Sequence, residues 1–324
     1  MSETGEPVSP KAPRADNTTL MAFLVLVLVG GSNAVAVRLT ISELPPFWGA
    51  ASRSLGAAAI FGAIVLIRRI ALPKGRALLG ATLYGALGIG ASYAFLYWSI
   101  RDIQAGLLMV VLSLGPLLTM FFAVAHRLER FRWRGLVGAL IALAGIAVGV
   151  GAELGRSVPA PSLLAAVAGA ACIAEGSVVY KLFPSEKPLP TNAVAFTAGA
   201  AVQLLVSLVA GESWFLPSAR RTVAAFAYLV VVGSVLLFYI YLYLLSRWTA
   251  SATSYAFLLF PVATVVIAAL VLNERVSWRF LLGAAIALVG VWVGALRQPA
   301  KAIPIERVAA AAVERCDPPY PGCA

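Results

Sequence analysis

The chain has 324 residues, of which 61% are hydrophobic and 12% are charged, and its formal net charge is +11. With a mean hydropathy of +0.90, it lies far from the composition of soluble domains and predicts a polytopic helical membrane protein. Its three cysteines and single histidine exclude a disulfide framework and a histidine-rich metal site, so we expect no metal and no cofactor.

Apolar runs of about 20 residues, long enough to cross a ~30 Å hydrocarbon core, recur along the whole chain. They predict ten transmembrane helices, at residues 20–39, 46–67, 77–99, 103–125, 134–152, 161–182, 190–210, 223–245, 249–271 and 278–296. The intervals between these runs are too short to hold a soluble domain. We expect residues 1–19 and 297–324 to be disordered cytoplasmic tails.

The second half of the chain repeats the first at a spacing of 145 residues. The matching positions include prolines, charged pairs and glycines: Pro116/Pro261, Glu129-Arg130/Glu274-Arg275, Trp133-Arg134/Trp278-Arg279, Gly138/Gly283, Gly145/Gly290 and Gly149/Gly294. The repeat divides the membrane unit into residues 20–152 and 161–296, with five predicted helices in each. Because five is odd, the second unit enters the membrane from the opposite side, which predicts an inverted repeat typical of alternating-access carriers.

The distribution of basic residues sets the predicted orientation. Of the 25 lysines and arginines, 17 fall on the side of the membrane that holds both termini, and 7 fall on the other side. This bias places both termini in the cytoplasm. It also explains the positive net charge without nucleic acid, so we expect the lipid bilayer, and no nucleic acid, as a partner.

Four segments resemble the drug/metabolite transporter superfamily, and within it the ten-helix EamA-type carriers. They are GGSNAVAVR (30–38), LPPFWGAASRSLGAAAI (44–60) and the two long stretches at 106–150 and 251–296, in which a proline, a Glu-Arg pair and a glycine-spaced closing helix follow one another. The resemblance covers roughly residues 20–296. It implies an all-α fold of ten transmembrane helices in two inverted five-helix repeats.

The resemblance also implies the activity: export of a small metabolite, such as an amino acid, across the cell inner membrane. A multidrug or lipophilic-cation exporter is the alternative. The sequence contains no HExxH, GxSxG or GxxxxGK[ST] motif, so neither an enzyme nor a self-sufficient ATP-driven pump is expected.

Arg53 and Glu175 are the clearest candidates for binding a small-molecule substrate, because ionisable side chains inside a membrane usually face a cavity or a partner. At the helical rise, Arg53 lies roughly 10 Å and Glu175 roughly 20 Å into their helices. One hypothesis is that they bind the carboxylate and the ammonium of a zwitterion. Alternatively, they pair with each other, or Arg53 extends to the interface. Glu175 also suits a proton as coupling ion, although facilitated exchange is equally consistent.

Two tyrosine pairs are further candidates. Tyr93 and Tyr97, like Tyr239 and Tyr243, are four residues apart, so each pair shares a helix face. Such faces can serve as gates or as a cation–π surface for substrate. The competing interpretation is an aromatic belt at the membrane interface.

Two prolines and an asparagine complete the candidate site. Pro116 and Pro261 fall near the middle of their predicted helices, where proline kinks a helix, and are expected to mark cavity walls. Asn33 is a weaker candidate, since hydrogen bonding between helices explains it equally well. The small-residue faces of the fifth and tenth helices are expected to pack against each other and to clamp the two halves together.

Overall fold

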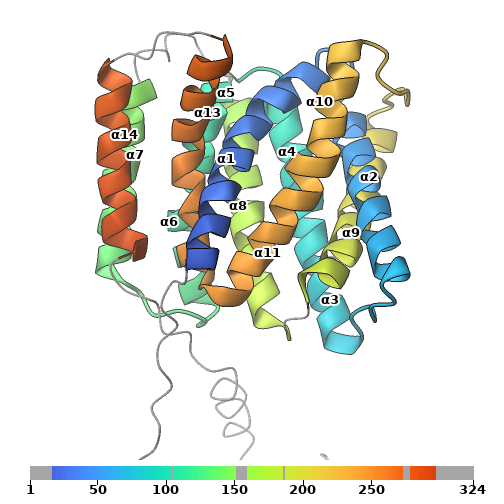
Figure 1. Ribbon diagram of the computed structural model, residues 1–324, viewed down its shortest axis with the longest axis horizontal. Helices are drawn as coiled ribbons and strands as arrows, with labels where there is room; N and C mark the ends of the chain where they lie inside the picture. The colour runs from blue at the N-terminus through green and yellow to red at the C-terminus, as the bar shows by residue number, and fades with distance from the viewer. Residues whose placement is uncertain (1–16, 104, 151–158, 185–186, 273–277, 297–324) are drawn as a thin grey trace, which may run out of the picture.

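The computed structural model describes residues 17–103, 105–150, 159–184, 187–272 and 278–296 (Figure 1). These residues form helices and their connections, with no strand among them. The helices are α1 (Asn17–Thr40), α2 (Pro46–Ile67), α3 (Gly75–Tyr84), η1 (Gly85–Ala91), α4 (Ser92–Ser99), α5 (Ala105–Leu112), α6 (Gly115–Ala125), α7 (Trp133–Val150), α8 (Ala160–Leu182), α9 (Pro188–Val209), α10 (Arg220–Val230), η3 (Val231–Leu236), α11 (Leu237–Arg247), α12 (Ala250–Ser254), α13 (Ala256–Leu272), α14 (Trp278–Val291) and η4 (Trp292–Leu296). Apart from residues 17–19, the predicted tails lie outside the described residues.

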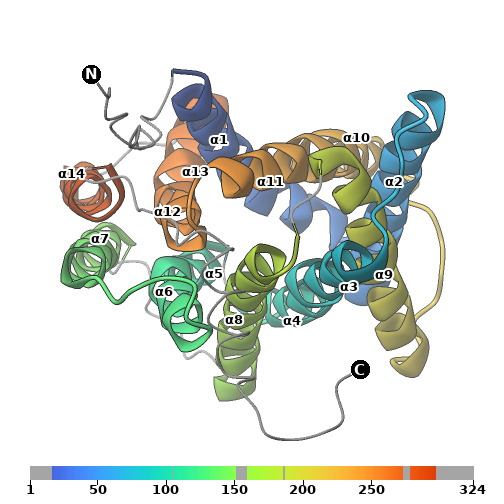
Figure 2. The same ribbon diagram turned by 90° about the horizontal axis from the view of Figure 1, so that it is seen from below.

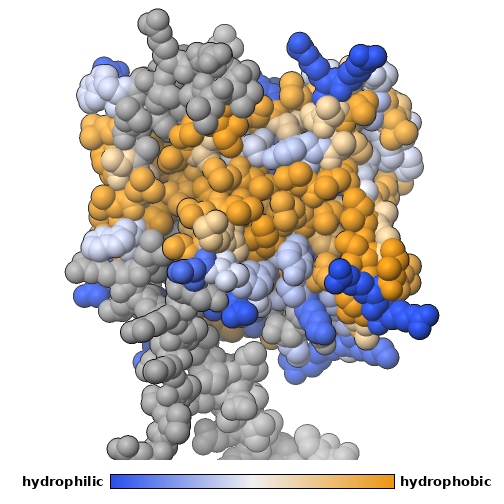
Figure 3. Space-filling model, in the orientation of Figure 1, coloured by the Kyte–Doolittle hydropathy of each residue, from blue (hydrophilic) through white to orange (hydrophobic). Residues whose placement is uncertain are grey.

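The all-α, polytopic membrane fold is confirmed. Within the described residues, six helices are individually long and apolar enough to cross a membrane, and four shorter apolar helices stand at the other predicted spans. Figure 3 shows the result on one face: an apolar band crosses the middle of the molecule, and hydrophilic residues gather at both ends. A helix satisfies its own backbone hydrogen bonds, which is the condition for placing it in hydrocarbon.

The packing of the helices follows the repeat. Figure 2 shows α7 and α14 as a pair at one edge of the molecule, and α2 and α9 as a pair at the opposite edge. In each pair, one helix is the repeat equivalent of the other. Between these edges α1 packs on α13, and the equivalent contact joins α8 to α6. The two halves are therefore interleaved, and each supplies helices to both sides of the centre.

Close packing of α7 against α14 confirms the predicted clamp. A methyl group on Gly138 would lie 2.6 Å from Gly294 Cα, and one on Gly145 would lie 2.6 Å from the carbonyl oxygen of Gly283. Only residues without a side chain allow two backbones to approach this closely.

The third and eighth spans each contain a π-helical segment at matching positions of the repeat. Ile89 in η1 corresponds to Ser234 in η3 at the 145-residue spacing. A π-helical turn displaces backbone groups from the regular pattern, and such turns are frequent at functional sites. Nothing in the helical periodicity of the sequence predicts these two segments.

The two prolines do not produce equivalent kinks, contrary to the prediction from the repeat. The fourth span is interrupted between α5 and α6, and Pro116 stands in the first turn of α6, where its missing N–H needs no partner. Pro261 instead lies inside the continuous helix α13, and the ninth span is interrupted earlier, at Tyr255. The position of the break therefore depends on the packing of each half, not on the proline alone.

Candidate functional site

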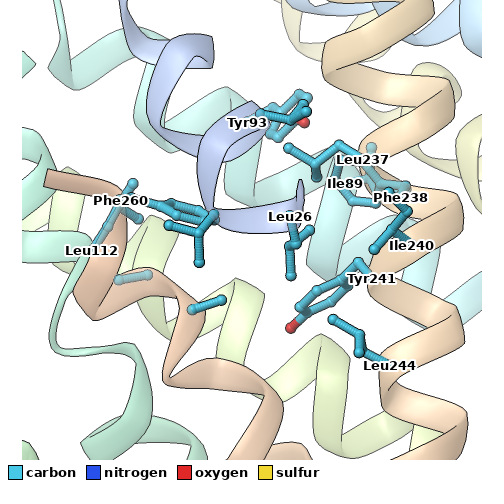
Figure 4. Packing of buried hydrophobic residues seen from close by; sticks show 14 of the residues in the cluster. Leu26, Ile89, Tyr93, Leu112, Leu237, Phe238, Ile240, Tyr241, Leu244 and Phe260 are labelled. Carbon is cyan, nitrogen blue, oxygen red and sulfur yellow. The ribbon is translucent and has the colours of Figure 1, made fainter. Parts of the chain in front are cut away.

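A cavity of about 130 Å³ lies at the centre of the molecule, between the two halves. Figure 4 shows four of the aromatic residues that line it, Tyr93, Phe238, Tyr241 and Phe260, placed around Leu26. The lining residues come from seven spans: Leu26, Gly30, Asn33, Val37, Arg53, Tyr84, Gly88, Tyr93, Leu96, Tyr97, Ile100, Leu108, Met109, Leu112, Ile173, Leu237, Phe238, Tyr241, Phe257 and Phe260. None of them belongs to α7 or α14, so in the described part of the chain the clamp stands outside the cavity.

Arg53 is the charged residue of this cavity, and its side chain is only 2% exposed. Its Nε donates to Ser234 Oγ at 2.7 Å and its Nη2 donates to the Gly233 carbonyl at 2.7 Å, both in η3. Nη1 reaches the Tyr97 hydroxyl at 3.4 Å, and the guanidinium carbon lies 4.9 Å from the centre of the Tyr93 ring. The guanidinium is thus held between α2, α4 and the π-helical segment of the eighth span.

Asn33 joins the same cluster. Its Nδ2 donates to the Gly233 carbonyl at 3.2 Å, so this one carbonyl accepts from both Asn33 and Arg53. A methyl group on Gly233 would collide with Asn33 Oδ1, so any larger residue there would displace the Asn33 side chain. Of the predicted site residues, the structure therefore brings together Arg53, Asn33, Tyr93 and Tyr97.

Glu175 lies elsewhere. Its Oε1 is 2.7 Å from Nε2 of His126, at the end of α6, and it is absent from the lining of the cavity. Glu175 and His126 are both partly exposed, and Glu175 Oε2 is buried without a hydrogen-bond partner. The geometry thus provides neither the predicted contact between Arg53 and Glu175 nor a zwitterion site between them.

The second tyrosine pair faces away from the cavity. Tyr239 is 40% exposed, and the ring of Tyr243 packs on the guanidinium of Arg247, with the guanidinium carbon 5.3 Å from the ring centre. Tyr241 lines the cavity instead and hydrogen-bonds Ser177 at 2.6 Å. Residues two positions apart on a helix point about 200° apart. The sequence prediction chose the helix face of Tyr239 and Tyr243, and Tyr241 lies on the opposite face.

The prolines lie near the cavity walls but outside its lining. Pro116 borders a smaller pocket beside the α6–α7 connection. The fourth and ninth spans still contribute to the walls, through Leu112 of α5 and through Phe257 and Phe260 of α13.

Sequence reasoning missed several aromatic residues of the cavity. Phe238 is the repeat equivalent of Tyr93, and the two rings meet edge to face with centres 6.2 Å apart. Residues 234, 237, 238 and 241 follow the i, i+3, i+4, i+7 pattern of one helix face. This pattern could have identified the face of the eighth span that lines the cavity. Within the described parts of the chain, no three histidine, cysteine or acidic side chains gather into a metal site.

Two carboxylates outside the membrane spans cap helices of the opposite half. Glu43 accepts from the backbone N–H and hydroxyl of Ser218 at the start of α10, and Glu212 accepts from the backbone N–H of Trp48 at 2.7 Å at the start of α2. Negative charge at a helix N-terminus is stabilising. The donors at Ser218, led by its backbone N–H, lower the pKa of Glu43 from 4.5 to about 2.

Comparison with known proteins shows the same architecture. The model of the EamA-like transporter family matches the chain twice, at residues 17–150 and 160–295. A solved crystal structure superposes with a TM-score of 0.73 over 86% of this chain and 98% of its own length, at 23% identity. At this low sequence identity, the similarity shows that the two proteins share a fold and nothing more.

Three curated relatives align along most of their length. The inner membrane transporter YedA of Escherichia coli K12 is 29% identical over 290 residues, 87% of this chain and 93% of the relative. The "Probable amino-acid metabolite efflux pump" of the same organism is 27% identical and covers 83% of this chain and 92% of the relative. The "Probable terminal-alkyne amino-acid exporter" of Streptantibioticus cattleyicolor is 26% identical and covers 83% and 91%.

Proposed function

Because the chain belongs to the EamA-like transporter family, we propose that it exports a small metabolite, such as an amino acid, across the cytoplasmic membrane by alternating access. The observation that carries this proposal is the central cavity, which is formed by helices of both repeats and contains a buried, preorganised arginine. The names of two relatives, an amino-acid metabolite efflux pump and an amino-acid exporter, support the substrate class.

The interleaved repeats support alternating access. If the two halves exchange their conformations, the cavity changes from one side of the membrane to the other. In the predicted orientation, the cavity runs from Val37 and Ile100, near the outer ends of their helices, towards Tyr241. Hydrogen bonds join the two halves at both ends of the molecule: Glu129 accepts from the Ser251 backbone towards the cytoplasmic end, and Glu43 accepts from Ser218 at the predicted outer end. Alternating access requires these two contacts to break in turn.

The cavity argues against the alternative, a multidrug or lipophilic-cation exporter. Pockets for drug-sized ligands enclose about 300–1,000 Å³, whereas this cavity encloses about 130 Å³. Arg53 also repels a cationic substrate, and no acidic residue is present among the lining residues to attract one.

Coupling of export to the movement of protons is a separate part of the proposal. His126 and Glu175 form a hydrogen-bonded pair at the predicted cytoplasmic end of α6 and α8, and histidine changes its charge near neutral pH. This pair is the described site best suited to link export to a proton gradient.

The experiment is a flux measurement with the purified protein in liposomes loaded with a broad mixture of amino acids and related metabolites. We expect selective loss of a small set of compounds, detected by mass spectrometry, relative to protein-free liposomes. Release of none of the compounds would contradict the transporter proposal. Release of lipophilic cations in preference to metabolites would favour the alternative.

A further inference from the structure

Among the described residues that line the cavity there is one positive charge and no carboxylate. Arg53 is the only one of them whose side chain is charged at neutral pH. Every acidic residue in the described part of the chain is bonded to a different partner. These pairs are Glu43 with Ser218, Asp102 with Ser162, Glu129 with Ser251, Glu175 with His126 and Glu212 with Trp48. A buried guanidinium without a carboxylate is costly inside a membrane. An anionic ligand would remove that cost.

The guanidinium is also held ready for a ligand. Its Nε and its two terminal nitrogens donate to Ser234, Gly233 and Tyr97, and the side chain of Tyr93 is a further hydrogen-bond partner. Both tyrosine hydroxyls are neutral, and the contact to Tyr97 is long at 3.4 Å, so a carboxylate can replace them as the stronger acceptor on the terminal nitrogens. Because η3 already fixes the side chain, little conformational entropy is lost on binding.

The remainder of the cavity offers no charged partner to an ammonium group. Its wall is formed mainly by aliphatic and aromatic side chains, among them Leu108, Leu112 and Ile173, and its unpaired acceptors, Asn33 Oδ1 and the Tyr84 hydroxyl, are neutral. Glu175, the predicted ammonium partner, is bonded to His126. An ammonium buried against this wall would lack a counter-ion and would lie near the positive charge of Arg53.

We propose that this site recognises small monocarboxylates with an apolar body, and that an α-amino group is not required. This inference rests on the proposed transport function and narrows its substrate class. One positive charge balances one carboxylate, whereas a phosphate or phosphonate dianion would leave a second negative charge unpaired. The apolar wall then selects the body of the substrate by burial of hydrophobic surface.

The test measures ligand binding to the detergent-purified protein as an increase in its melting temperature, which follows directly from affinity. The probes share one carbon skeleton: leucine, isocaproate, isoamylamine, isocaproamide and isoamylphosphonate. We expect isocaproate to stabilise the protein more than leucine, whose ammonium lacks a counter-ion there, and the amine, the amide and the phosphonate to have no effect. Stabilisation by isoamylamine, stronger binding of the phosphonate, binding of leucine without isocaproate, or no response to any probe would each overturn the inference.

Variants locate the binding group. We expect Arg53→Gln to weaken isocaproate binding about 10- to 100-fold, as for loss of a charge-assisted hydrogen bond. Arg247→Gln is the matched control, because it removes another arginine that stacks on a tyrosine, outside the cavity. Full isocaproate affinity in Arg53→Gln would overturn the inference, as would an equal loss in Arg247→Gln. If Arg53→Gln does not fold, Arg53→Lys replaces it, and we expect it to bind isocaproate more weakly than the wild type but still in preference to isoamylamine.

Failure of this inference can be distinguished from failure of the proposed function. If the liposome panel shows metabolite export while the carboxylate probes do not bind, the substrate class is wrong and the transporter proposal stands. If the carboxylates bind and no compound crosses the membrane, the site is correct and the transport function is wrong.

Discussion

Arg53 and Glu175 are both charged residues within membrane helices, but they lie in different surroundings. Arg53 is held by the π-helical segment η3 at the wall of the central cavity, whereas Glu175 is paired with His126 and is partly exposed. The sequence identifies both residues as unusual because a charged side chain inside a membrane helix is costly, and this holds whichever way the side chain points. Their different partners come from segments 40 or more positions away in the chain.

Glu175→Gln tests proton coupling. If the His126–Glu175 pair carries the coupling proton, we expect this variant to lose the dependence of export on the pH gradient, because the amide cannot bind and release a proton. The measurement is the export rate from liposomes at several internal and external pH values. His126→Gln, which removes the other half of the pair, should have the same effect. An unchanged pH profile in Glu175→Gln excludes the proton role.

Glu43→Gln tests the cap between the two halves. Because the pKa of Glu43 is lowered from 4.5 to about 2, its charged form is favoured by folding. Its contribution to stability is fully present above pH 4.5 and is lost as the pH falls from 4.5 to about 2. We therefore expect the variant to melt below the wild type at pH 7, and the difference to shrink as the pH approaches 2.

Ser218→Ala is the control for this cap. It removes one of the hydrogen bonds to Glu43 and keeps the backbone donors of Ser218 and Ala219, so we expect a smaller difference at pH 7. A melting-temperature difference between Glu43→Gln and the wild type that stays constant from pH 7 to pH 2 would contradict the assigned interaction.

At the scale of the helices, small residues and π-helical turns decide how the elements meet. The glycine faces of α7 and α14 bring two backbones into direct contact. The π-helical segments break the regular pattern of the third and eighth spans, and η3 thereby presents the Gly233 carbonyl to Arg53 and Asn33. Gln203 of α9 makes the corresponding bond in the other half, donating to the Ile89 carbonyl of η1 at 2.9 Å.

Gly138→Ala tests the clamp. The added methyl group would lie 2.6 Å from Gly294 Cα and 2.7 Å from the Gly290 carbonyl, and backbone atoms cannot move aside cheaply. We expect a loss of about 1–3 kcal/mol in the free energy of unfolding, typical of overpacking. The measurement is unfolding by SDS titration in mixed micelles. Gly62→Ala is the matched control, because no atom lies within 4 Å of the added methyl group. Equal stability of the two variants would contradict the clamp.

At the scale of the whole molecule, the two repeats are interleaved, so neither five-helix unit encloses the cavity alone. Helices of the first half supply Arg53 and Tyr93, and helices of the second half supply Gly233 and Phe238. A site of this kind depends on both halves and on their relative position, which is the requirement for alternating access.

The orientation of the molecule is tested by fusions. With both termini in the cytoplasm, a fluorescent protein fused after residue 324 should fluoresce, and alkaline phosphatase fused there should be inactive, because it needs the oxidising periplasm. Phosphatase fused after Pro217, in the connection between α9 and α10, should be active. Active phosphatase at the C-terminus would reverse the predicted topology.

Much of the fold could be predicted because its causes are local. Hydropathy locates the spans, and the 145-residue spacing relates the two halves. Glycine spacing anticipates the contact between α7 and α14. The candidate site was predicted less completely. Arg53, Asn33, Tyr93 and Tyr97 are brought together, but Tyr239 and Tyr243 were selected where Tyr241 lines the cavity. All three lie in one short aromatic run, and the choice depends on how α11 is rotated in the bundle.

The sequence by itself therefore determined the class of protein, the number of spans and the relation between the halves, because membrane solvation acts on each segment independently. Only the tertiary structure decided which residues share the cavity, that Glu175 pairs with His126, and that Arg53 is held by a π-helical carbonyl without a counter-ion. Those facts depend on helix rotation and on contacts between distant segments, and no local property of the chain encodes them.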